Sequence, residues 1–225
     1  MQDLIAQGCD PKKVQVARLG VEKPNNAINP FNESKTRTIV TCSNIVGLKR
    51  LDLLIAALSQ IDDKSIHWVH FGDGIQRDSI EQLASKQLSG KSNIQYTFKG
   101  SVPVQTILDF YGSVSVDCFI NCSDVEGIPV SIMEAMSYGI PCIARNVGGN
   151  SEIVFDSVNG FLLPGDCSAA QLAQCIIRVL ELKEEERSLV RDRAVETYQT
   201  YYNAKKNHTQ FWAEIVKWAS NDIIR

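Results

Sequence analysis

The chain has 225 residues, of which 44% are hydrophobic and 22% are charged, an ordinary composition for a soluble globular protein. Its net charge of -3 gives no general attraction to nucleic acid or to an anionic membrane surface, so no nucleic-acid partner is expected. No stretch approaches the roughly 20 apolar residues of a membrane helix, and the first residues lack the apolar core of a secretory signal. These features predict a cytoplasmic protein in which any phosphate site is local.

Seven cysteines lie at irregular intervals, most of them in apolar stretches. The odd number and this setting favour free thiols in a reducing compartment over disulfides. Cys118 and Cys122 are the closest pair, but no second pair and no histidine stands at ligand spacing, so no metal site is expected. His67 and His70 flank a strand-like run and are interpreted as structural residues.

Residues 1–35 resemble the end of one domain followed by a linker. A helix end at 3–8 and a short strand at 14–19 are expected first, and 21–34 is rich in Pro and Asn. The compact domain is predicted over 36–197. The last part, 184–225, is helical, charged at first and then aromatic. Its aromatic residues either belong to the core, which is the favoured interpretation, or face a missing partner domain.

From residue 36 onward, short apolar runs alternate with helical patterns. Strands are expected at 38–43, 66–71, 94–99, 116–121, 141–144 and 160–163, and helices or helical turns at 51–58, 78–87, 106–111, 129–138, 152–156 and 169–182. This alternation predicts an α/β fold, a Rossmann-like three-layer parallel sheet with helices on both faces. Ligands of such sheets bind beyond the carboxyl ends of the strands.

The segment 123–153 is the most informative for chemistry. Gly127 permits close backbone approach, and Pro129 suits the first turn of a helix. A helix that begins after a buried strand presents free N–H groups, which bind anions such as the phosphates of a nucleotide. Glu126 precedes this helix and Glu134 lies about one turn inside it, so their carboxylates flank the anion site. Taken alone, the pattern is more often a plain helix start with two solvated glutamates.

Two further strand-to-helix loops are expected at the same sheet edge. Gly148 and Gly149 follow the fifth strand and resemble a second loop that approaches phosphate, although a lone Gly-Gly is a weak signal. Lys49 and Arg50 follow the first strand and could neutralise an anion or form a solvated charge pair. All of these loops are expected at one edge of the sheet, and this common location carries more weight than any one motif.

These segments resemble the donor-binding domain of glycosyltransferases with the GT-B fold, specifically the large retaining family 4, the glycosyl transferases of group 1. Seven residues separate Glu126 from Glu134, as in the signature glutamate pair of that family. The resemblance covers more than half of the chain and implies the donor half of a GT-B fold. In chain order, the matching motifs are SNIVGLKRLDLLIAAL, HFGDG, YTFKGSVP, FINCSDVEGIPVSIMEAMSYGIPCIARNVGGNSEIV and NGFLL.

The resemblance implies a role for each matching residue at a site for a nucleoside diphosphate sugar. Lys49 and Glu126 would be the catalytic residues: Lys49 stabilises charge on the departing diphosphate, and Glu126 contacts hydroxyls of the transferred sugar. Glu134 would contact the ribose. The backbone amides of Ile128, Val130 and Ser131 would meet the phosphates, Gly100, Ser101 and Val102 would lie beside the base, and Gly72, Asp73 and Gly74 would line the cleft. Asn44 and Gly127 complete the expected donor-binding residues.

One position departs from the family pattern. The family pairs its lysine with an arginine five residues earlier, where this sequence has Asn44. Asn44 can donate a hydrogen bond but carries no charge, and on helical geometry Arg50 should point elsewhere. Stabilisation of the leaving group would therefore depend more heavily on Lys49.

Family members have a second Rossmann-like half that holds the acceptor, so the resemblance implies a missing amino-terminal acceptor domain. It favours a truncated chain over a natural split enzyme. Residues 198–225 would then be the helix that crosses back to pack on the amino-terminal half, and any peripheral membrane association would belong to the absent half. The implied reaction is hexosyl transfer with retention from a UDP- or GDP-linked sugar, without metal or other cofactor, in polysaccharide or glycoconjugate biosynthesis. No carboxylate is assigned as a covalent nucleophile. The fragment alone is expected to bind the donor weakly and to transfer nothing.

Two interpretations from other classes stay open. The chain could be a nucleotide-binding or regulatory module without transfer activity, which the uncharged Asn44 favours. It could also be a scaffold whose aromatic tail docks a partner. The presence of Lys49, Glu126 and Glu134 argues against both.

Overall fold

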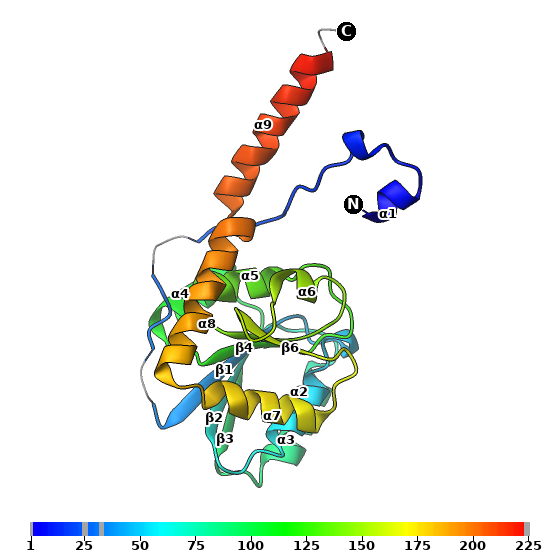
Figure 1. Ribbon diagram of the computed structural model, residues 1–225. Coiled ribbons are helices and arrows are strands. Elements are labelled where there is room, and N and C mark those ends of the chain that lie inside the picture. Colours follow the sequence, from blue (N-terminus) through cyan, green and yellow to red (C-terminus); the bar gives the residue numbers. More distant parts are fainter. Residues whose placement is uncertain (1, 24–26, 32–33, 223–225) are drawn as a thin grey trace.

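The computed structural model describes residues 2–23, 27–31 and 34–222, and a six-stranded sheet with helices on both faces lies at its centre (Figure 1). Neighbouring strands all pair in parallel, in the order β3-β2-β1-β4-β5-β6. The predicted α/β, Rossmann-like class is confirmed. The strands are β1 (Thr36–Cys42), β2 (Ser65–Phe71), β3 (Ile94–Phe98), β4 (Cys118–Asn121), β5 (Cys142–Arg145) and β6 (Gly160–Leu163).

The helices begin where the sequence supplies helix starts. Pro129 precedes α5, and Ser168 caps α7 in a reciprocal capping box with Gln171. The helices are α1 (Gln2–Ala6), α2 (Leu51–Leu58), α3 (Arg77–Leu88), α4 (Val104–Ser113), α5 (Val130–Ser137), α6 (Asn150–Ile153), α7 (Ala169–Leu180), α8 (Glu184–Thr197) and α9 (Ala204–Asp222), with 3-10 turns at Pro11–Lys13 and Gly47–Lys49 and a π-helical turn at Tyr198–Tyr202.

The two faces of the sheet build two hydrophobic cores, because successive strand residues point to opposite faces. Ile39 and Trp68 pack with the helices α2, α3 and α7 on one face. Val40 and Val69 pack with α4 and α5 on the other. Figure 1 shows the same division, with α4 and α5 above the sheet and α2, α3 and α7 below it. The central strands are therefore covered on both sides, which explains their nearly continuous apolar sequences.

The strand order determines where a ligand can bind. β1 pairs directly with β4, through Ile39–Cys118 and Val40–Phe119, and the chain proceeds outward from this pair in both directions. At such a switch point, the loops that follow the two strands diverge and leave a crevice at their carboxyl ends. The loops after β1 and β4 are those that carry Lys49 and Glu126.

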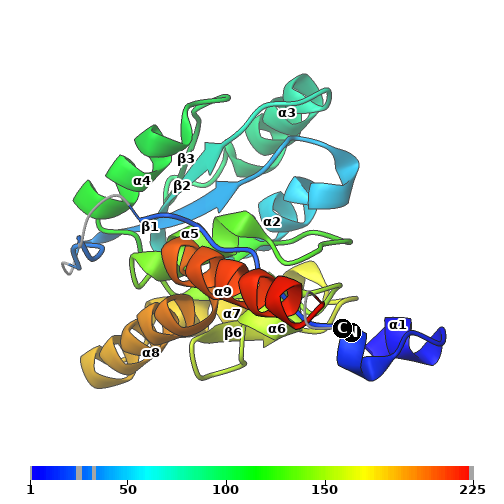
Figure 2. The same ribbon diagram turned by 90° about the horizontal axis from the view of Figure 1, so that it is seen from above.

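Two predicted segments differ from the structure. The predicted strand at 116–121 begins only at Cys118, since the backbone N–H of Val116 donates to the side chain of Asn29 (3.1 Å). The predicted strand at 14–19 is wrong. This stretch passes beside α9 without a neighbouring strand, and the described chain pairs nearby through a single bridge between Val21 and Asn203 (Figures 1 and 2).

The amino-terminal segment crosses the carboxy-terminal helices at Val21. The N–H of Val21 donates to the carbonyl of Tyr202 (2.9 Å), and the N–H of Ala204 donates back to Val21 (3.2 Å). Gly20 is needed here because a Cβ would lie 2.6 Å from the Tyr202 carbonyl oxygen. Over the described part of the expected single helix at 198–225, the structure has a π-helical turn and α9, separated at Asn203. Residues 223–225 of that expectation lie outside the described residues.

Some of the carboxy-terminal aromatic residues belong to the core, as the favoured interpretation has it, and others are exposed, as the alternative has it. Tyr198 and Tyr202 are buried in the core beside α5, whereas Phe211, Trp212 and Trp218 of α9 are exposed. α9 projects from the body of the domain (Figure 1). A groove of about 670 Å³ lies between α9 and residues 13–18. None of the helices described here is long and apolar enough to cross a membrane.

All seven cysteines are free thiols, as predicted. Cys9 is exposed and Cys42 is half-buried, whereas the other five are buried. Burial raises the pKa of the Cys42 thiol to about 12.

The core on the α2 face can be tested at Leu54, which is completely buried. Leu54→Ala should lower the free energy of unfolding by about 2–5 kcal/mol, because it removes packed methyl groups and leaves a cavity. Urea denaturation measures this change. Leu189→Ala, at an exposed leucine of α8, should change it by less than about 0.5 kcal/mol. Equal effects of the two substitutions would contradict the described core.

Candidate functional site

The loops after β1 and β4 are joined by their backbones. The N–H of Asp124 donates to the carbonyl of Leu48 at 2.8 Å. The loop after β1 ends in the 3-10 turn Gly47–Lys49, and the loop after β4 leads into α5. This contact holds the two loops side by side at the switch point of the sheet.

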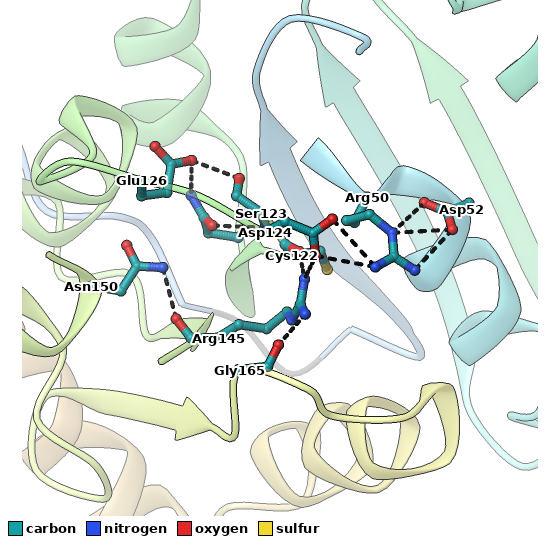
Figure 3. A network of polar contacts seen from close by, with 10 residues as sticks. Arg50, Asp52, Cys122, Ser123, Asp124, Glu126, Arg145, Asn150 and Gly165 are labelled. Atoms are coloured by element: carbon teal, nitrogen blue, oxygen red, sulfur yellow. Dashed lines mark hydrogen bonds and ion pairs between the residues drawn. The ribbon is translucent and has the colours of Figure 1, made fainter. Parts of the chain in front are cut away.

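Lys49 and Glu126 meet between these loops. The Lys49 Nζ lies 2.6 Å from the Glu126 Oε1. The same oxygen accepts from the Ser123 hydroxyl at 2.6 Å and from the Asn121 Nδ2 at 3.1 Å. Figure 3 shows the bond from Ser123, with the second oxygen of Glu126 turned away from it. The structure thus brings together the two residues that the sequence singled out as catalytic.

The ionisation of Glu126 reflects these contacts. Burial opposes the charged carboxylate, but the hydrogen bonds from Lys49, Ser123 and Asn121 outweigh it and hold the pKa of Glu126 below its ordinary value. Glu126 is therefore a carboxylate at neutral pH, with one oxygen occupied by three donors and the other oxygen turned elsewhere. An ionised oxygen of this kind can accept a hydrogen bond from a hydroxyl group.

A second polar network supports the loop after β4 from the opposite side (Figure 3). Arg50 has a left-handed backbone (φ 51°) and pairs with Asp52 and Asp124. Arg145, buried at the end of β5, also donates to Asp124 and to the carbonyl oxygens of Cys122 and Gly165. Hydrogen bonds from Arg145 and Arg50 hold the pKa of Asp124 below its ordinary value. These bonds fix the loop that carries Glu126.

The end of the loop before α5 and the first turn of α5 supply backbone donors beside Glu126. Within the described chain, the N–H groups of Ile128, Val130 and Ser131 donate to no other group of the protein. Val130 is exposed and Ser131 is half-buried. Free N–H groups and the positive end of the helix dipole attract an anion to this position.

Glu134, one turn further along α5, is in a different environment. Its side chain is buried, and no described residue gives its carboxylate a hydrogen bond. Burial raises the pKa of Glu134 to about 7. Near neutral pH the group exists in both forms and can donate or accept a hydrogen bond.

The two glycines after β5 pack against the Glu126 loop. Gly148 has a left-handed backbone (φ +50°), and a Cβ there would lie 1.7 Å from the Glu126 carbonyl oxygen. The N–H of Gly149 donates to the carbonyl of Gly127 at 3.0 Å. The expected phosphate-approach loop therefore has a supporting role in the structure, because these glycines let two backbones touch.

The remaining predicted residues lie at the carboxyl ends of β1, β2 and β3. Gly72 has a φ of +135°, and a Cβ there would lie 1.9 Å from the Ser43 carbonyl oxygen. Gly72 also donates its N–H to the carbonyl of Gly100 at 2.9 Å, and Asp73 pairs with Arg77. Among the described contacts, none joins this group to Lys49 or Glu126. Asn44, Asp73 and Ser101 are exposed, and Val102 is half-buried against the core. Gly127 is also exposed, but it lies in the loop after β4, next to Glu126.

Sequence reasoning did not identify Asn121, Ser123, Asp124 and Arg145. Asn121 and Ser123 precede Glu126 within the same motif, so their position was a usable signal. Arg145 is a charged residue in a four-residue strand that is otherwise apolar, which pointed to a buried partner. No cluster of three or more His, Cys, Asp or Glu in the described ranges is placed to hold a metal ion.

A family model for the glycosyl transferases of group 1 matches residues 23–194. The chain belongs to this family. The putative colanic acid biosynthesis glycosyltransferase WcaL of Escherichia coli (strain K12) is 29% identical over 209 residues, which cover 87% of this chain and 49% of the relative. The amylovoran biosynthesis glycosyltransferase AmsK of Erwinia amylovora is 28% identical over 185 residues, which cover 78% and 44%. This group 1 chain thus spans about half the length of these curated relatives.

Solved structures of glycosyltransferases share the fold of this family member. The apo form of the lipopolysaccharide outer core galactosyltransferase WaaB has a TM-score of 0.75 and 20% identity, covering 95% of this chain and 59% of that one. The Anabaena Alr3699/HepE complex with UDP and glucose has a TM-score of 0.74 and 20% identity, covering 96% and 60%. These likenesses establish the GT-B Rossmann-like fold.

The close contact at Gly148 gives a test of the site's backbone. Gly148→Ala should lower the free energy of unfolding by more than about 1 kcal/mol, because the new methyl group meets the Glu126 carbonyl and φ is positive. Gly90→Ala is the control, since a Cβ there meets nothing within 4 Å. Chemical denaturation of both variants checks the difference, and a neutral Gly148→Ala would refute the described packing.

Glu134 gives a pH-dependent prediction. Its folded pKa lies above the ordinary value of 4.5, so the folded state binds the proton more tightly than the unfolded state does. The contribution of Glu134 to stability should therefore be greatest at low pH and fall as pH rises from about 4.5 to about 7. The free energy of unfolding should fall by at most about 1.4 kcal/mol per pH unit in this range. Glu134→Gln should remove this dependence. Urea denaturation across pH 4–8 measures it, with the surface variant Glu185→Gln as control. Parallel curves for wild type and Glu134→Gln would contradict the prediction.

Proposed function

We propose that this chain is the donor-binding half of a retaining glycosyltransferase and that it holds a nucleoside diphosphate sugar at the carboxyl ends of β1 and β4. The observation that carries this proposal is the meeting of Lys49 with Glu126, at 2.6 Å, beside the first turn of α5. A cation, free backbone N–H groups and an oriented carboxylate there match the phosphates and hydroxyls of such a donor.

In this proposal the diphosphate lies at the amino terminus of α5. The amides of Ile128, Val130 and Ser131 donate to phosphate oxygens, and Lys49 supplies the positive charge. When the bond between the anomeric carbon and the diphosphate breaks, negative charge grows on the leaving group, and Lys49 stabilises it. The exposed Asn44 adds no charge, so Lys49 carries most of this stabilisation.

The two glutamates contact different parts of the donor. Glu126, kept ionised by its three donors, accepts hydrogen bonds from sugar hydroxyls. Glu134, with its pKa near 7, exchanges hydrogen bonds with the ribose. The loops at Gly72, Asp73 and Gly100 to Val102 line the cleft toward the base.

The proposal also covers the acceptor-binding half and the biosynthetic process in which the enzyme acts. The matched relatives are about twice as long as the matched region, which supports the proposal that a second half binds the acceptor. Names of relatives in colanic acid and amylovoran biosynthesis support polysaccharide assembly. Solved structures of Alr3699/HepE with UDP and with UDP-glucose support a UDP-linked hexose as the donor. By itself this half transfers nothing.

Calorimetric titration with UDP, GDP and ADP tests the proposed donor site. Wild type should prefer one nucleotide, and Lys49→Ala should weaken it about tenfold or more, because a charge-assisted contact with phosphate is lost. Lys86→Ala, at an exposed lysine of α3, is the charge-matched control and should leave binding unchanged. Equal binding by wild type and Lys49→Ala would overturn the proposed role of Lys49.

A nucleotide-binding module without transfer activity is the second candidate, because Asn44 leaves one cation fewer at the phosphates. Both candidates predict nucleotide binding. They separate in the full two-half protein, where only an enzyme should release nucleoside diphosphate from UDP-glucose in the presence of acceptor.

A further inference from the structure

The two oxygens of the Glu126 carboxylate have very different hydrogen bonding. Lys49, Ser123 and Asn121 all donate to Oε1, at 2.6, 2.6 and 3.1 Å, and no described residue donates to Oε2. A single carboxylate oxygen with three donors is fixed in direction. The second oxygen is therefore fixed as well, and it stays available to a ligand.

Two of the three donors belong to the rigid end of β4. Asn121 is the last residue of the strand, and Ser123 follows two positions later; both are buried. The Asn121 Oδ1 accepts from the N–H of Ser123 at 3.2 Å, which ties the two donors to each other. Their positions are therefore fixed by the strand and by this short loop, independently of any ligand.

The third donor, Lys49, is free to change partners. It is a long, flexible side chain, about one quarter exposed, on the opposite loop. A diphosphate carries more negative charge than one carboxylate and draws an ammonium group more strongly. If Lys49 alone held Glu126, the carboxylate would lose its orientation as soon as the diphosphate bound.

We propose that Asn121 and Ser123 are positioning residues that keep Glu126 directed toward the transferred sugar when Lys49 turns to the diphosphate. This inference rests on the proposed donor site and adds two residues to it. They act through Glu126 rather than on the donor itself. The chain thereby separates two tasks: Lys49 responds to phosphate, and the end of β4 maintains the sugar contact.

The first experiment needs no ligand. Protein labelled with ¹³C in its glutamate carboxyl groups is titrated by NMR, and the Glu126 signal is assigned with Glu126→Gln. Asn121→Asp keeps the shape and the acceptor for the Ser123 N–H, but it replaces the donor with a negative charge. Ser123→Ala should raise the Glu126 midpoint by about one pH unit, because it removes a hydrogen bond to the charged form. Asn121→Asp should raise it by about one pH unit or more, because it removes a hydrogen bond and adds a like charge. Unchanged midpoints in both variants would overturn the proposal.

The second experiment compares UDP-glucose with UDP by calorimetry, since only the former carries a sugar. Ser123→Ala should weaken UDP-glucose about tenfold and leave UDP unchanged within about twofold, a loss of about one charge-assisted hydrogen bond. Ser123→Thr, which retains the hydroxyl, should restore most of the affinity. Ser137→Ala is the matched control: Ser137 is equally buried, but its hydroxyl donates to the backbone carbonyl of Glu134.

The outcomes separate the two proposals. Equal weakening of both ligands by Ser123→Ala would mean a general structural role and would overturn the positioning role. Absence of binding by wild type to either ligand would count against the proposed donor site for UDP sugars, while the NMR titration would still decide whether Asn121 and Ser123 control Glu126. Lys49→Ala should weaken both ligands, in contrast to Ser123→Ala.

Discussion

β1 and β4 pair directly in the middle of the sheet, although the strands β2 and β3 separate them along the sequence. The rest of the site depends on this pairing. It places the two following loops next to each other, and the bond from Asp124 to Leu48 joins them. Only then can Lys49 on one loop reach Glu126 on the other. The glycines at 148 and 149 complete the arrangement by allowing the loop after β5 to touch the same backbone.

Much of the fold could be predicted from the sequence because each strand is a short apolar run that ends in turn residues. β6 and α2 were predicted with their bounds, and the other strands within two residues. The predicted strand at 14–19 failed for a physical reason: a short strand-like run cannot show whether a second strand is available to pair with it. The predicted domain boundaries, at 36 and 198, stay predictions.

The candidate site could be predicted in part. Lys49 and Glu126 stand out from their motifs, and the strand order brings them together. The bonds from Asn121, Ser123 and Arg145 could not be deduced in the same way, since they depend on loop conformations such as the left-handed backbone of Arg50. α5 and the loop before it also carry two glutamates whose pKa values are shifted in opposite directions. Glu126 accepts hydrogen bonds, whereas the buried Glu134 accepts none from the described chain.

The distribution of cysteines has a practical consequence for solution work. Cys9 alone is exposed, and burial raises the pKa of every other thiol. Alkylating reagents attack thiolates, so a maleimide at neutral pH should react first at Cys9. The sequence therefore contains one preferred attachment point for a fluorophore, well separated along the chain from Lys49 and Glu126. Movements of the amino-terminal segment relative to the sheet can be followed there without removing any other cysteine.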